Sequence, residues 1–131
     1  KAKVERYGLE DEVVFTGFVP DGELARLYNE ATLLVFPSIE EGFGLPAIEA
    51  MACGTPVVAS RTGSLPEVLG PVGRYFDPTN SAEMAKVIAE VLNNEGERRT
   101  MSRAGIERSR RFSWDQAAED TLAIFDELRR S

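Results

Sequence analysis

The chain has 131 residues, with 15 basic and 22 acidic side chains, a formal net charge of −7 and 43% hydrophobic residues. These values are typical of one globular domain, and they exclude disordered, collagen-like and disulfide-stapled proteins. The sequence contains no histidine, which excludes imidazole catalysis and the common zinc sites within this chain.

Apolar runs of strand length alternate with segments of helical period, the pattern of an α/β fold with a parallel sheet. Strands are predicted at residues 13–16, 32–36, 56–60 and 72–76. Helices are predicted to follow Asp21, Ser81 and Ser113, each of which can serve as an N-cap. We therefore predict a Rossmann-like parallel sheet of about four strands with flanking helices. Residues 1–131 are expected to form a single, incomplete domain with a helical tail from about residue 97.

A glycine-rich loop joins the second and third predicted strands. Gly42 and Gly44 flank Phe43, Pro46 suits the first turn of a helix, and Gly54 suits its C-terminal cap. Such a loop presents free backbone N–H groups and the positive end of a helix dipole, which is how parallel α/β folds hold phosphate. A tight strand-to-helix turn without a ligand would explain a lone pair of glycines equally well.

Two glutamates near this loop favour a ligand. Glu49 is the only polar side chain between Leu45 and Cys53, in a helix that we expect to be buried, so it needs a partner. The pattern is equally compatible with the two hydroxyls of a ribose and with a buried ion pair to Arg61. Glu41, eight positions earlier, would repel phosphate, which indicates a ligand that also carries hydroxyls or a developing positive charge, such as a sugar attached to a diphosphate.

Residues 37–60 read PS-x-x-EGFGLP-x-x-EAMACG-x-PVVAS. This pattern resembles the signature of the family-four retaining glycosyltransferases, which have the GT-B architecture. The resemblance continues at residues 14–19, 63–68, 73–76 and 112–114 and so covers nearly the whole chain. It implies the donor-binding C-terminal domain of such an enzyme, truncated on its N-terminal side.

The resemblance also implies roles for individual positions. Glu41 would be the catalytic candidate, beside the hydroxyls of the donor sugar, and Glu49 would hold the ribose. The other donor-binding positions would be Gly42, Phe43, Gly44 and Leu45 at the sugar and diphosphate, Phe18 and Val19 at the nucleobase, and Ser38 near the phosphates. For Ser38, a hydrogen bond that caps its own loop is an equal alternative.

The function implied is the donor-binding part of a retaining glycosyltransferase that moves a hexosyl group from a nucleotide diphosphate sugar to an acceptor hydroxyl. No cofactor and no metal are expected. The family's diphosphate-binding arginine and lysine, and its acceptor-binding N-terminal domain, have no counterpart in these residues, so the chain alone is expected to be nearly inactive. Two alternatives stay open: a non-catalytic nucleotide-binding or interaction module, and a GT-B nucleotide-sugar epimerase.

The strand order implied by the resemblance, 3-2-1-4-5-6, leaves a gap between residues 13–16 and 32–36. We predict that the first of these strands either docks beside the exposed edge of the second or pairs with another chain. The second outcome would be a route to self-association through a sheet edge.

The remaining features predict an ordinary protein surface. Six arginines lie between residues 98 and 111 without interleaved aromatic residues, which favours a solvated helix face over an anion site. No apolar segment approaches the roughly 20 residues of a membrane-spanning helix, and the first residues do not resemble a signal peptide. We therefore expect no nucleic-acid partner, no transmembrane segment and a cytoplasmic location, with peripheral membrane attachment left open for a longer parent protein.

Overall fold

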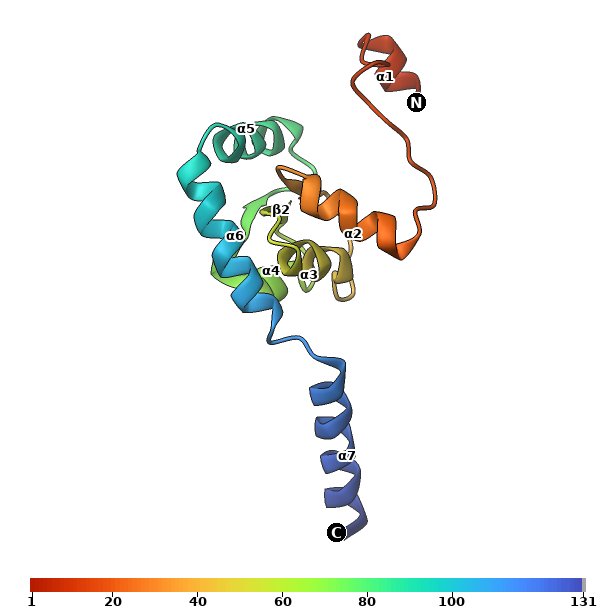
Figure 1. The fold of residues 1–131 in the computed structure, drawn as a ribbon, viewed down its shortest axis with the longest axis vertical. Helices are drawn as coiled ribbons and strands as arrows, with labels where there is room; N and C mark the ends of the chain where they lie inside the picture. Colours follow the sequence, from red (N-terminus) through yellow and green to blue (C-terminus); the bar gives the residue numbers. More distant parts are fainter. Residues whose placement is uncertain (131) are drawn as a thin grey trace.

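The computed structural model describes residues 1–130, and a parallel sheet lies at the centre of this structure (Figure 1). Its strands are β1 (Leu34–Phe36), β2 (Val57–Ser60) and β3 (Arg74–Phe76), in the order β1-β2-β3. Leu34 pairs with Val57, and Val58 pairs with Arg74. The predicted α/β class with a parallel sheet is confirmed.

Helices connect the strands and cover both faces of the sheet. These are α2 (Asp21–Glu30), α3 (Leu45–Ala52), α4 (Leu65–Leu69) with the 3-10 turn η1 (Gly70–Val72), α5 (Ser81–Leu92) and α6 (Glu95–Ser109). Two more helices, α1 (Ala2–Arg6) and α7 (Trp114–Arg130), stand away from this body at opposite ends of the molecule (Figure 1). No helix within residues 1–130 is both long enough and apolar enough to cross a membrane.

The core consists of one apolar cluster on each face of the sheet, because side chains alternate along a strand. On one face, Val57 and Ala59 pack with residues of α3 and α4 such as Met51 and Leu65. On the other face, Val58 packs with Phe76 and with residues of α5 and α6. All of β2 is therefore buried, as its nearly continuous apolar run predicted.

The strand predicted at residues 13–16 is wrong for this structure. The segment forms no strand and does not pair with β1, and Val14 and Phe15 are 82% and 56% exposed. Its apolar residues favour an extended backbone, but a strand also needs a neighbouring ladder, and within residues 1–130 none lies beside it. The outer edge of β1 is accordingly unpaired in the described part of the chain, and pairing with another chain stays a prediction.

Two of the three predicted helix caps are displaced by one residue. Helix α2 is preceded by Pro20, with Asp21 in its first turn, where a carboxylate favours the helix dipole. Helix α5 is capped by Asn80, whose Oδ1 accepts a hydrogen bond from the Glu83 N–H at 3.0 Å. The cap predicted for the last helix is confirmed, because Ser113 Oγ accepts a hydrogen bond from the Gln116 N–H at 3.4 Å.

Two arginines of α6 hold other helices in place. Arg108 donates to the carbonyls of Glu67 and Val68 at the end of α4, both at 2.5 Å. Arg98 donates in the same way to the last carbonyls of α5. These contacts cap helix C-termini, so the expectation of a merely solvated helix face is wrong for this pair.

Candidate functional site

The predicted glycine loop lies where β1 ends and α3 begins. Gly44 is the N-cap residue of α3 and has a left-handed backbone with φ of +92°. Helix α3 starts at Leu45, so Pro46 occupies its second position rather than its first. Gly54, with φ of +78°, follows the last helical turn. The predicted loop and helix are therefore confirmed to within one residue.

The loop leaves backbone N–H groups without acceptors at the start of α3. Within residues 1–130 the N–H groups of Gly42 and Gly44 donate no hydrogen bond, and Leu45, as the first helical residue, has no intrahelical acceptor. The N–H of Phe43 lies 3.4 Å from Glu41 Oε1. Free N–H groups at the positive end of a helix dipole can bind an anion such as a phosphate.

The loop that follows β2 supports the glycine loop. Thr62 Oγ1 donates a 3.0 Å hydrogen bond to the Ser38 carbonyl. Gly63 packs so tightly that a Cβ there would lie 2.4 Å from the Glu41 carbonyl oxygen. Ser38 Oγ donates to the Glu40 carbonyl at 2.8 Å, so the structure shows the loop-capping alternative for this side chain. The backbone of Glu41 thus packs against the loop that follows β2.

Glu49 lies on the exposed face of α3, and the expectation of a buried side chain is wrong. The helix buries Ala47, Ala50 and Met51 instead. Glu49 Oε2 accepts a 3.2 Å hydrogen bond from the hydroxyl of Tyr28, which belongs to α2. Burial, together with the negative charge of Glu49, raises the pKa of Tyr28 to about 12.

The alternative prediction for Glu49, a buried ion pair with Arg61, is also wrong. Within residues 1–130, Arg61 makes no ion pair with Glu49. Arg61 is exposed at the end of β2, where its charge helps to lower the pKa of Asp77, although hydrogen bonds from Thr79 are the main cause of that shift. Glu49 thus has room for a ligand as a second partner.

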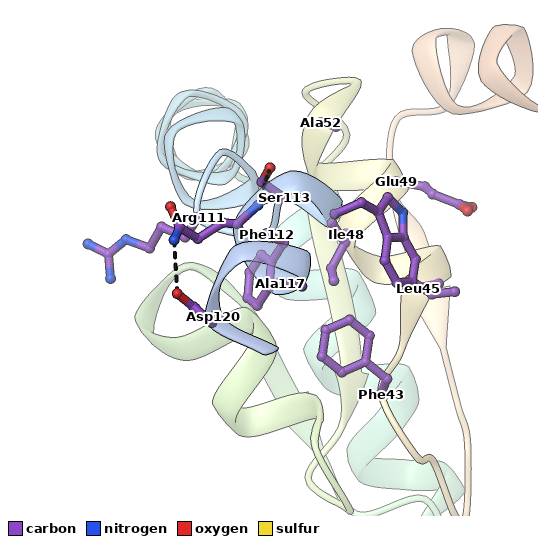
Figure 2. A pocket seen from close by; sticks show the side chains of 12 residues that line it. Phe43, Leu45, Ile48, Glu49, Ala52, Arg111, Phe112, Ser113, Ala117 and Asp120 are labelled. Atoms are coloured by element: carbon purple, nitrogen blue, oxygen red, sulfur yellow. Dashed lines mark hydrogen bonds between the residues drawn. The ribbon is translucent and has the colours of Figure 1, made fainter. Parts of the chain in front are cut away.

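A cleft of about 390 Å³ lies against the outer face of α3 (Figure 2). Phe43, Leu45, Ile48 and Glu49 line one side, and residues around the start of α7 line the other. Phe43 meets Phe112 edge to face, with 6.0 Å between the ring centroids. The predicted glycine loop therefore contacts the segment that leads into α7. Sequence reasoning missed this neighbourhood, although residues 112–114 belong to the family pattern.

The predicted site residues fall into two groups. Ser38, Glu41 and residues 42–44 lie together in one loop. Leu45 begins α3, and Glu49 lies one turn further along that helix. Phe18, which is 91% exposed, and Val19, which is half-buried, lie in the segment before α2. Their role at a nucleobase stays a prediction. No three carboxylate, thiol or imidazole side chains gather into a metal-binding group anywhere in residues 1–130.

Ser64, at the start of α4 beside the site, has a buried hydroxyl without a hydrogen-bond partner within the described residues. Because an unpaired buried hydroxyl destabilises a fold, Ser64→Ala is expected to raise the free energy of unfolding by up to about 1 kcal/mol. Ser60→Ala is the control. It removes a buried hydroxyl that donates to the Phe36 carbonyl, and it should lower stability. Urea denaturation measures both, and a destabilised Ser64→Ala would contradict the prediction.

The parallel sheet, its flanking helices and the glycine loop before α3 define a Rossmann-like α/β protein. The chain belongs to the family described as glycosyl transferases group 1, whose model matches residues 1–108. It is 39% identical over 128 residues to the serotype-specific mannosyltransferase WbdA of Escherichia coli. That alignment covers 97% of this chain and 16% of WbdA.

Solved structures of similar fold agree with this assignment. Sucrose-phosphate synthase from Thermosynechococcus elongatus superimposes with a TM-score of 0.90 and 36% identity, over 98% of this chain and 33% of that one. HepE from Anabaena, in complex with UDP and glucose, gives a TM-score of 0.84 and 31% identity, over 93% of this chain and 34% of that one. The chain thus spans about a third or less of the length of these relatives. The predicted membership of the GT-B glycosyltransferases is confirmed.

Proposed function

We propose that this chain is the donor-binding part of a retaining glycosyltransferase that transfers a hexosyl group from a nucleotide diphosphate sugar to an acceptor hydroxyl. The observation that carries the proposal is the loop after β1. Its N–H groups at Gly42 and Gly44, which are unpaired within residues 1–130, lie in the sequence between the carboxylates of Glu41 and Glu49. The complex of HepE with UDP and glucose supports a nucleotide sugar as the ligand.

In this proposal, different residues of the site bind different parts of the donor. The free N–H groups and the dipole of α3 bind the diphosphate, so no metal and no cofactor is needed there. Glu49 accepts hydrogen bonds from the ribose, and Phe18 and Val19 contact the nucleobase. Glu41 accepts hydrogen bonds from the hydroxyls of the sugar and stabilises the positive charge that develops as the glycosidic bond breaks.

The acceptor would be bound by a separate domain, so transfer requires more than these residues. Acceptor and sugar must be held together for reaction, and the chain alone is expected to bind the donor without transferring it. The retaining outcome rests on the family resemblance, and a cytoplasmic location of the enzyme is part of the same proposal.

Titration of the chain with ADP, GDP, UDP, CDP, dTDP and their hexose derivatives, followed by calorimetry, tests donor binding. We expect one base to be preferred. Glu49→Ala should lower the affinity for the preferred nucleotide about tenfold or more, because a carboxylate that accepts hydrogen bonds contributes about 1.5–3 kcal/mol to binding.

Glu40→Ala is the matched control, because it removes the same charge from an exposed side chain of the neighbouring glycine loop. It should bind the nucleotide as the original chain does. If the folded chain responded to none of these nucleotides, donor binding would be refuted. If Glu49→Ala bound as tightly as Glu40→Ala, Glu49 would be removed from the site.

A further inference from the structure

The only side-chain partner of Glu49 within residues 1–130 is Tyr28, which comes from a different helix. We propose that Tyr28 is a positioning residue, which holds the Glu49 carboxylate in the orientation that accepts hydrogen bonds from the vicinal hydroxyls of a ribose. This inference rests on the proposed donor site. Tyr28 belongs to α2, outside both the glycine loop and α3.

Tyr28 is itself held firmly. Its backbone carbonyl accepts a 2.5 Å hydrogen bond from Thr55 Oγ1, and Thr55, just before β2, is 4% exposed. The ring of Tyr28 is half-buried against the apolar cluster that contains Ala50 and Met51. A side chain with only two rotatable bonds, anchored at its backbone and packed along its ring, places its hydroxyl at a defined point.

Glu49 needs such support because it is exposed and has several rotatable bonds. Without a partner, its carboxylate would sample many orientations, and binding would have to fix one of them. A carboxylate has about four lone-pair directions, so one hydrogen bond from Tyr28 leaves enough capacity for two ribose hydroxyls.

The protonation state of Tyr28 is consistent with a permanent donor. Burial and the negative charge of Glu49 raise its pKa to about 12, so the hydroxyl keeps its proton throughout the physiological range. Loss of that proton would place two negative charges beside each other. The Tyr28 hydroxyl is therefore available as a donor to Glu49 throughout that range.

The test compares the nucleoside diphosphate that the chain prefers with its 2′,3′-dideoxy form, which has no ribose hydroxyls for Glu49. Tyr28→Phe removes only the hydroxyl. We expect this substitution to lower the affinity for the ribose form about three- to tenfold and to leave the affinity for the dideoxy form unchanged. In a Glu49→Ala background, Tyr28→Phe should have no further effect on either ligand.

Tyr75→Phe is the matched control. The Tyr75 hydroxyl is also hydrogen-bonded, to the Gly70 carbonyl at 2.5 Å, but it belongs to β3 and does not touch Glu49. It should leave the preference for the ribose form intact. Thermal unfolding of each variant separates lost binding from lost folding.

The possible outcomes are distinct. If Tyr28→Phe lowered the affinity for both ligands equally, Tyr28 would have a general structural role and the proposal would be overturned. An unchanged affinity for both ligands would overturn it as well. If the original chain bound the ribose and dideoxy forms equally, the role of Glu49 at the ribose would be wrong, and the role of Tyr28 with it. If it bound neither form, the proposed function itself would fail.

Discussion

Replacement of Gly63 by alanine is expected to lower the free energy of unfolding by about 2–4 kcal/mol. Gly63 has φ of +55°, which alanine adopts only with strain, and its added Cβ would lie 2.4 Å from the Glu41 carbonyl oxygen. That oxygen belongs to the backbone, so it cannot rotate away as the tip of a side chain could. The glycine loop would have to shift, and we expect nucleotide affinity to fall together with stability.

Gly42→Ala is the control for this substitution. Gly42 lies in the glycine loop itself and has no positive φ. An added Cβ there would have no atom within 4 Å. Its stability should stay within about 0.5 kcal/mol of the original chain. Urea denaturation followed by circular dichroism measures both variants. Equal stability of the two would show that the contact between the loops does not restrain Glu41.

Arg108→Met is expected to lower the free energy of unfolding by about 2–4 kcal/mol, because it leaves two carbonyls at the end of α4 without their charged donor. Methionine retains much of the apolar stem, so the loss reports mainly on the guanidinium group. The same guanidinium group packs closely against Gly70, where an added Cβ would lie 2.6 Å from Arg108 Cζ.

Arg110→Met provides the comparison on the same helix end. Arg110 forms an ion pair with Glu107 at 3.0 Å, in which the two side chains are 72% and 76% exposed. Exposed pairs of this kind contribute at most about 1 kcal/mol. Chemical denaturation of both variants in the same buffer should therefore separate them clearly. A loss in Arg108→Met no greater than in Arg110→Met would refute the capping role.

The elements that sequence reasoning found are those whose signal is local. Residues 32–36 and 56–60 are apolar runs bounded by turn residues, and each contains a strand of the sheet. Gly44, Pro46 and Gly54 mark the ends of α3 because each residue type suits one particular backbone position. Such signals do not depend on the rest of the fold.

The errors concern features that depend on distant parts of the chain. Residues 13–16 have strand-forming side chains, but pairing needs a neighbour that the sequence pattern does not identify. Apart from Glu49, helix α3 is apolar all round, so the sequence pattern does not distinguish its exposed face, which carries Leu45 and Glu49, from its buried face. The contact of Tyr28 with Glu49 joins residues 21 positions apart and depends on how α2 packs against α3.

The two loops of the candidate site follow strands of different resistance to local opening. Residues 61–64 follow β2, which is buried throughout and hydrogen-bonded to a strand on each side. Residues 37–44 follow β1, which is hydrogen-bonded on one side within the described chain. Opening β2 breaks two ladders and exposes both apolar clusters, whereas opening β1 breaks one ladder, so the free energy of opening is lower for β1. The loop that carries Glu41 is therefore expected to open locally more often than residues 61–64 do.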